Sequence, residues 1–219
     1  MEQTILNPFQ KKTLDFFKKT SLSKKFYLSG GTALAEVYLH HRYSEDLDFF
    51  TAEELNLEEL KRFSNLVAKK NHIQKIEFQH GFGLYTFFMK DKQRVNKIDF
   101  GQYPFEPIEE LVKFNDIKVE SLFDIAVNKA HTIAFRPRLR DFIDLYCILQ
   151  EKKGWTIDDL LQKSFEKFEM RVDALQLGTN LIQVKTLADM PVMIKKINLQ
   201  EVQKFFLEKA KALKTEVLK

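Results

Sequence analysis

The chain has 219 residues, of which 44% are hydrophobic and 30% are charged. This length can bury a substantial core, and this composition excludes an intrinsically disordered chain. No apolar run approaches the roughly 20 residues of a membrane-spanning helix, and the first residues lack a signal-peptide pattern, so we expect a cytoplasmic protein without a membrane partner. The formal net charge of +4 permits an anionic partner such as a nucleic acid but does not require one.

The first half of the chain mixes helical and strand periodicity. An amphipathic helix is predicted from Pro8, and another within 52–70, where Thr51 and Glu54 form a capping-box pattern. A short apolar run, 26–28, reads as a strand that ends at a glycine pair. Three further strands are predicted at 73–79, 83–90 and 94–100, the last two joined as a hairpin.

The second half is helical by its periodicity. The segment 101–107, GQYPFEP, contains two prolines that neither a helix nor a central strand tolerates, and it is predicted to separate the halves. Helices are predicted at 121–135, 139–151, 157–168, 172–187 and 199–213. The predicted fold class is α/β (α+β), with a small mixed sheet in domain 1–106, followed by an all-helical domain 107–219 that is expected to close over it.

The segment 27–50, YLSGGTALAEVYLHHRYSEDLDFF, carries the chemistry. Asp46 and Asp48 alternate with Leu47 and Phe49, so both carboxylates point to one face of a strand. Two anions this close repel each other, and a divalent cation such as Mg²⁺ resolves the conflict when it binds together with substrate phosphates. The alternative is a buried corner with a solvated acidic strand end.

The glycine pair suits a phosphate. Gly30 and Gly31 have no side chain, so their backbone can approach a phosphate closely, and the N–H groups that open the next helix can point toward it. Thr32 and Ser44 are candidate hydroxyl ligands beside this bend. The order of strand, Gly-Gly, helix and Asp-x-Asp strand is more specific than either motif alone.

Two groups in the second half call for an explanation. Lys129 lies on the apolar stripe of its helix, which is costly unless an anion meets it, and either a salt bridge or a triphosphate would serve. Asp141 and Asp144 lie three residues apart, and Arg140 four before Asp144, on a helix that is apolar on both sides. These polar groups are therefore paired with one another or functional.

GGTAL, YLHHRYSEDLDFF and DIAVNKAHTIAFRPRLRDFIDLY together resemble the AbiEii/AbiGii nucleotidyltransferase-fold toxins of abortive-infection and toxin–antitoxin systems. By this resemblance Lys129 matches a helix lysine of the family, and Asp144, or Asp141, matches its late aspartate. Asp99 resembles the third acid of nucleotidyltransferases, as metal ligand or general base, with a solvated strand end as the alternative. The wider superfamily often has Gly-Ser where this chain has Gly31-Thr32.

The resemblance implies a Mg²⁺-dependent enzyme that moves a nucleoside monophosphate from a nucleoside triphosphate (NTP) to an acceptor hydroxyl. Asp46, Asp48 and Asp99 would bind the metal, Gly30, Gly31, Thr32, Ser44, Lys129 and Asp141 the nucleotide, and Asp144 would position Lys129 or the nucleotide. The expected acceptor is an RNA end, that of transfer RNA first, and a cognate antitoxin is an expected partner. The alternatives are a protein or small-molecule acceptor, and a non-catalytic relative that binds nucleotide or a partner.

Overall fold

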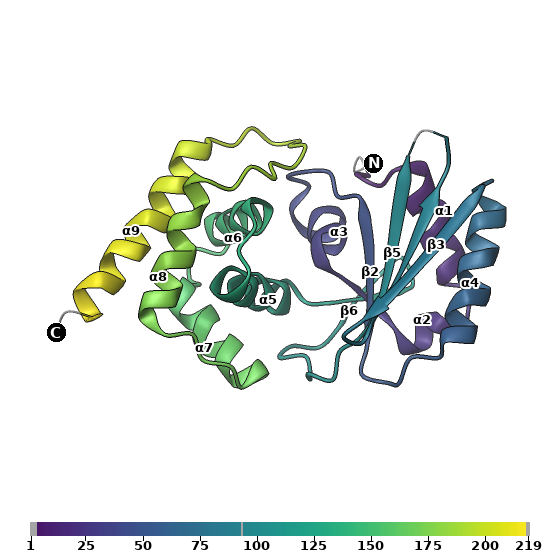
Figure 1. Ribbon diagram of the computed structural model, residues 1–219, viewed down its shortest axis with the longest axis horizontal. Helices are drawn as coiled ribbons and strands as arrows, with labels where there is room; N and C mark the ends of the chain where they lie inside the picture. Colours follow the sequence, from purple (N-terminus) through teal and green to yellow (C-terminus); the bar gives the residue numbers. More distant parts are fainter. Residues whose placement is uncertain (1–3, 93, 218–219) are drawn as a thin grey trace. The chain divides into compact units, whose positions relative to one another are not determined.

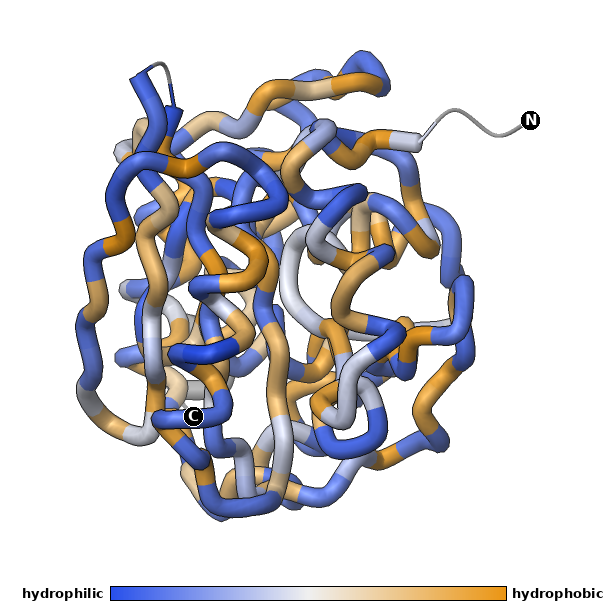
Figure 2. The backbone as a smooth tube through the Cα atoms, turned by 90° about the vertical axis from the view of Figure 1, so that its right-hand side faces the viewer, coloured by the Kyte–Doolittle hydropathy of each residue, from blue (hydrophilic) through white to orange (hydrophobic). Residues whose placement is uncertain are grey.

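The structure is a computed structural model, and it describes residues 4–92 and 94–217. The chain forms two compact units, a sheet unit that ends at Ser121 and a helical unit that begins at Leu122 (Figure 1). Hydrophilic and hydrophobic residues alternate along much of the chain in Figure 2, as expected for elements with one buried face. No helix in the described residues is long and apolar enough to cross a membrane.

The sheet unit is built on a mixed sheet, in which the described residues form seven strands in the order β3-β4-β5-β2-β1-β7-β6. The central strand β2 is antiparallel to β1 and parallel to β5. This confirms the predicted α/β class with a mixed sheet. The strands are β1 (Tyr27–Ser29), β2 (Asp46–Thr51), β3 (Lys75–Gly81), β4 (Leu84–Lys90), β5 (Val95–Gln102), β6 (Val112–Phe114) and β7 (Ile117–Val119).

Helices cover one face of this sheet (Figure 1). Phe49 of β2 stacks on Phe17 of α1 at a centroid distance of 4.2 Å, and Phe100 of β5 meets Phe63 of α4 edge to face at 5.8 Å. These aromatic contacts form the core, which accounts for many of the phenylalanines. The helical segments are α1 (Pro8–Phe17), α2 (Leu22–Lys25), α3 (Gly30–Ala33), a π-helix (Leu34–Leu39) and α4 (Leu57–Lys70).

The predicted cap of the helix after β2 is wrong. Thr51 is the last residue of β2, and its hydroxyl accepts the N–H of Glu53 instead. Helix α4 begins at Leu57, where Asn56 accepts the N–H of Glu59. Thr51 and Asn56 are both residue types that often cap helices. Thr51 cannot cap α4, because it pairs within the sheet as the last residue of β2.

The boundary between the units lies later than the predicted 106/107. β5 continues through Gln102, and the hairpin of β6 and β7 adds to the sheet, where Leu28 pairs with Val119 in parallel. The two prolines at 104 and 107 therefore lie in a loop inside the sheet unit.

The helical unit contains long amphipathic helices that pack through aromatic and aliphatic side chains. Phe142 of α6 and Phe206 of α9 meet at 4.8 Å in its interior, and both are fully buried. Helix α6 begins at Leu139, whose N–H donates to Asp189 Oδ1 at 2.8 Å. The helices are α5 (Leu122–Phe135), α6 (Leu139–Glu151), α7 (Ile157–Phe168), α8 (Ala174–Ile182), a 3-10 turn (Gln183–Lys185) and α9 (Leu199–Val217).

Candidate active site

Three carboxylates share the sheet face opposite α1 and α4. Asp46 and Asp48 alternate with buried residues of β2, and the parallel register pairs Asp48 with Asp99 of β5. Because paired residues of adjacent strands point to the same side of a sheet, all three side chains lie on one face. We call Asp46, Asp48 and Asp99 the carboxylate face.

A lysine lies within the carboxylate face. The register pairs Lys97 with Asp46, and its ammonium lies 2.6 Å from Asp99 Oδ2 and 3.2 Å from Asp46 Oδ2. Burial, the largest single influence, lowers the pKa of Lys97, but the hydrogen bond to Asp99 and the charges of Asp99, Asp46 and Asp48 together raise it above its ordinary value. Lys97 is thus a firmly held cation that offsets repulsion among these carboxylates.

The glycine bend lies directly against the carboxylate face. Gly30 has a φ of +68°, and a Cβ at this position would lie 2.2 Å from Asp48 Oδ2. Both the backbone conformation and the space therefore require glycine here. The bend opens α3 and the rare π-helix that follows, and π-helical turns often occur at functional sites.

The second glycine faces a cationic and hydroxyl pair. A Cβ on Gly31 would lie 2.5 Å from an Arg42 guanidinium nitrogen and 2.9 Å from Ser44 Oγ. Arg42 is 4% exposed, and it donates a hydrogen bond to the Tyr43 carbonyl oxygen at 2.9 Å. A planar guanidinium beside a glycine backbone and a hydroxyl is a donor set that suits a phosphate.

Two polar side chains hold this bend in place. The Thr32 hydroxyl is fully buried and donates to the Asp46 carbonyl oxygen, which ties α3 to β2. Gln10 of α1 donates to the Ser44 carbonyl oxygen at 2.8 Å. Thr32 thus has a positioning role, and its predicted contact with a phosphate stays a prediction.

The late polar residues form a second cluster, inside the helical unit. The ammonium of Lys129 lies 2.5 Å from Asp141 Oδ1 and 2.8 Å from Asp144 Oδ2, and the Asp144 side chain is fully buried. The structure thus brings Lys129, Asp141 and Asp144 together. The lysine forms salt bridges with both carboxylates. Arg140, which was expected on the same patch, instead lies 3.9 Å from Asp189.

The oxygen donors of the carboxylate face are of the kind that Mg²⁺ prefers. Within the described part of the chain, no group of three or more His, Cys, Asp or Glu side chains is gathered closely enough to hold a metal, so the predicted three-carboxylate shell is not assembled in advance. Asp99 Oδ1, however, is buried without a hydrogen-bond partner among these residues, and Asp48 lies against the glycine bend. Mg²⁺ needs only one or two carboxylates when phosphates and waters complete its shell.

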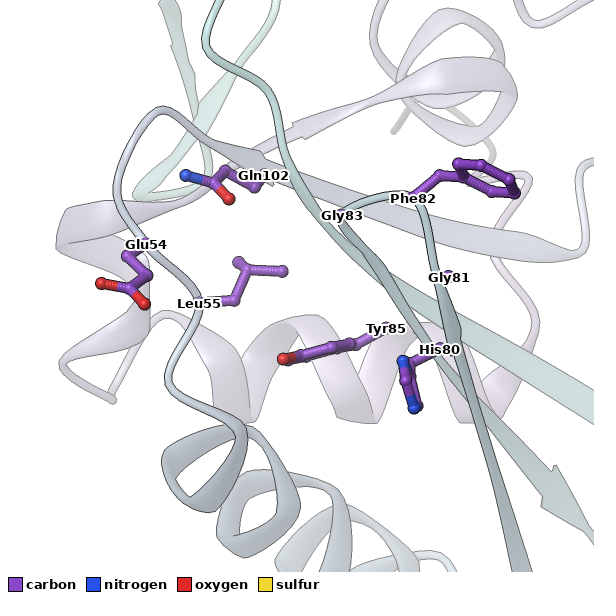
Figure 3. Close-up of a pocket in the computed structure, with 8 residues that line it drawn as sticks. All are labelled: Glu54, Leu55, His80, Gly81, Phe82, Gly83, Tyr85 and Gln102. Atoms are coloured by element: carbon purple, nitrogen blue, oxygen red, sulfur yellow. The ribbon is translucent and has the colours of Figure 1, made fainter.

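A pocket of about 240 Å³ lies at the turn between β3 and β4, apart from the carboxylate face (Figure 3). Tyr85 pairs with Phe100, which points to the helix-covered face, so its ring lies on the side of the sheet opposite Asp99. None of the predicted site residues lines this pocket, whose lining is Glu54, Leu55, His80, Gly81, Phe82, Gly83, Tyr85 and Gln102.

Lys97 and Arg42 are the site residues that the sequence predictions missed. Lys97 lies two residues before Asp99 in the same predicted strand. This spacing indicates that both side chains point to one face of the sheet. Arg42 stands two residues before Ser44, but no local pattern indicates that it is buried. Its proximity to Gly31 comes from the turn between the π-helix and β2.

The chain is similar to known proteins over most of its length. The family model described as the nucleotidyl transferase AbiEii toxin of type IV toxin–antitoxin systems matches residues 14–215. The uncharacterized protein aq_aa25 of Aquifex aeolicus (strain VF5) is 29% identical over 206 residues, covering 92% of this chain and 94% of that protein.

Two crystal structures share the fold. JHP933 from Helicobacter pylori is 20% identical with a TM-score of 0.56, covering 94% of this chain and 90% of its own. A candidate nucleotidyltransferase from H. pylori is 19% identical with a TM-score of 0.58, covering 95% and 96%. Similarity at these identities shows the fold, which is the predicted nucleotidyltransferase-like one.

Proposed function

Because the chain belongs to the AbiEii family of nucleotidyl transferases of type IV toxin–antitoxin systems, we propose that its carboxylate face performs Mg²⁺-dependent transfer of a nucleoside monophosphate from an NTP to a hydroxyl. One observation supports this most strongly. The parallel register of β2 and β5 pairs Asp48 with Asp99, beside a glycine bend whose Cβ positions are taken by Asp48 and Arg42. This convergence of charged groups beside a glycine bend supports an anion site with a metal.

The reaction joins the acceptor hydroxyl oxygen to the α-phosphorus of the NTP. The bond from that phosphorus to the bridging oxygen breaks, pyrophosphate leaves, and the hydroxyl proton passes to a base, for which Asp99 is our candidate. Asp46 and Asp48 would hold Mg²⁺, which supplies charge stabilisation at the phosphates when bound. Asp99 Oδ1 would be its third ligand in the alternative in which Asp99 is not the base. Arg42, Ser44 and the backbone of Gly30 and Gly31 would orient the phosphate tail.

We also propose that the Lys129 cluster is required for nucleotide binding. Its lysine is held by two carboxylates, so removing the ammonium leaves the buried Asp144 uncompensated and lowers stability as well. Lys129→Met should therefore weaken NTP binding at a temperature where the variant is still folded. If its nucleotide affinity equals that of the parent once folding is verified, the cluster is structural alone.

The acceptor and the antitoxin are further proposals. We propose an RNA end, with transfer RNA first, and a cognate antitoxin encoded with this chain, because the family is that of type IV toxin–antitoxin systems. Growth arrest on expression in a bacterial host would then follow from the blocked RNA end. Expression of Asp48→Ala should leave growth normal, and equal growth of cells expressing the parent would contradict the toxin assignment.

Incubation of the protein with NTPs labelled at the α-phosphate, Mg²⁺ and separate cellular fractions tests the acceptor. We expect label in the transfer RNA fraction, and none in any fraction when the metal is chelated. Label in the protein fraction would show that the acceptor is a protein. It would contradict the RNA acceptor and leave the proposed transferase activity standing. The absence of label from every fraction, with nucleotide binding intact, would favour a non-catalytic role.

A further inference from the structure

Lys97 occupies a particular place among the carboxylates. Its ammonium bridges Asp46 Oδ2 and Asp99 Oδ2, at 3.2 and 2.6 Å, so it joins the first and third carboxylates of the face. A divalent ion that binds through these two Oδ2 atoms would have to displace the ammonium. The sheet fixes this arrangement, because Lys97 is the register partner of Asp46 and lies two residues before Asp99 on the same side of β5.

Lys97 also contributes charge to the carboxylate face. Lys97 places one positive charge among the three carboxylates, at the position between Asp46 and Asp99 where a second divalent ion would otherwise offset their repulsion. The Asp99 side chain is 5% exposed and that of Lys97 is 29% exposed, so little water screens their contact and displacing the ammonium is costly.

The remaining donors lie away from the ammonium. Asp99 Oδ1 has no hydrogen-bond partner among the described residues, and Asp48 Oδ2 lies against Gly30, where the phosphates are proposed to bind. One cation at this place could contact both the protein and the nucleotide, while Lys97 keeps the Oδ2 atoms.

We propose that the Lys97 ammonium takes the place of a second divalent ion, so that this enzyme binds a single divalent ion with its nucleotide. Two-metal sites place ions about 3.5–4 Å apart to stabilise the attacking and leaving oxygens. Here Lys97 performs the charge compensation on the Asp46 and Asp99 side, and the one metal serves the phosphates. This inference rests on the proposed function, since it concerns the metal of that same reaction.

The test counts ions without turnover. Mn²⁺ replaces Mg²⁺, an α,β-methylene NTP analogue replaces the NTP, and bound Mn²⁺ is measured by electron paramagnetic resonance on the full-length chain. We expect one Mn²⁺ per chain in the parent. In Lys97→Met we expect a second bound ion and the line broadening of two neighbouring spins. The second Mn²⁺ should bind at least tenfold more tightly to Lys97→Met than to the parent.

Lys90→Met is the matched control. Lys90 forms an ion pair with Glu77 at 2.5 Å on the neighbouring strands, and it contacts none of the three carboxylates in any ion pair of the described residues. It should keep one ion. Lys97→Gln repeats the measurement if Lys97→Met does not fold.

The outcomes separate the two proposals. Two ions in the parent, or one ion in both Lys97 variants, overturns the role of Lys97 and leaves the transferase proposal standing. No bound ion in any variant, although the analogue binds, contradicts the proposed metal-dependent function itself.

Discussion

At the scale of single residues, the site depends on a glycine at position 30. Gly30 combines a left-handed backbone with a Cβ position that the Asp48 carboxylate already occupies. A Cβ on Gly31 would meet the Arg42 guanidinium and the Ser44 hydroxyl. These contacts bring the backbone close to the charged groups without an intervening methyl group. The glycine bend is therefore a condition for the geometry of the carboxylate face.

Gly30→Ala tests this directly. The new methyl group would force Asp48 aside, and the φ of +68° costs a non-glycine residue about 1–2 kcal/mol, so we expect transfer to fall by at least about tenfold and the free energy of unfolding to drop. Urea unfolding and a transfer assay measure the two effects.

Gly178→Ala is its control. Nothing lies within 4 Å of a Cβ on Gly178, which stands in helix α8, so the change should raise stability by up to about 1 kcal/mol and leave transfer unaltered. Full activity of Gly30→Ala would show that the bend does not constrain Asp48.

At the scale of elements, buried polar contacts hold the helices of the helical unit together. Lys167 of α7 lies 2.7 Å from Asp124 of α5, and these side chains are 2% and 0% exposed. Asp124→Asn removes one charge of a fully desolvated pair and should lower the free energy of unfolding by about 3–5 kcal/mol. A loss below about 1 kcal/mol, as expected for Lys163→Ala at an exposed pair with Glu166, would contradict this view.

His131 gives the same interface a pH dependence. It lies on α5, 2.9 Å from the Ser164 hydroxyl of α7, and burial lowers its pKa. The unfolded chain therefore binds a proton below pH of about 6.5 that the folded chain resists, so stability is present at higher pH and falls on acidification. Urea unfolding at pH 7.5 and 5.5 should show this loss in the parent and a smaller one in His131→Gln. Equal losses would assign the effect to other groups.

Element boundaries were predictable where the local pattern was long. Helices α6 and α7 begin and end at the predicted residues, because twelve or more residues of helical periodicity define each. The three-residue strands β6 and β7 are too short to show a period, and their pairing partner β1 lies far back in the chain. The bridge from Lys97 to Asp46 likewise spans 51 residues, so only the register of the sheet reveals it.

At the scale of the whole molecule, both units belong to one family. The family match runs from 14 to 215 and thus includes the carboxylate face of the sheet unit and the Lys129 cluster of the helical unit. The sequence motifs at 28–50 and 121–150 indicated this family through their glycine pair and the spacing of their charged residues. The charge contacts of Lys97 and Arg42 needed coordinates, because the sheet register brings Lys97 to Asp46 and the turn before β2 brings Arg42 to Gly31.

The central claim is that Asp48, on the carboxylate face, drives nucleotidyl transfer. The decisive measurement is the rate of α-phosphate label transfer from NTP to transfer RNA by the parent, by Asp48→Asn and by Asp116→Asn. Asp116 is an exposed turn residue paired with Lys113, and its substitution makes the same change of charge away from the face. We predict a loss on the order of 10²–10³-fold for Asp48→Asn, since several kcal/mol of charge stabilisation disappear, and parent activity for Asp116→Asn. Parent activity in Asp48→Asn would contradict the account.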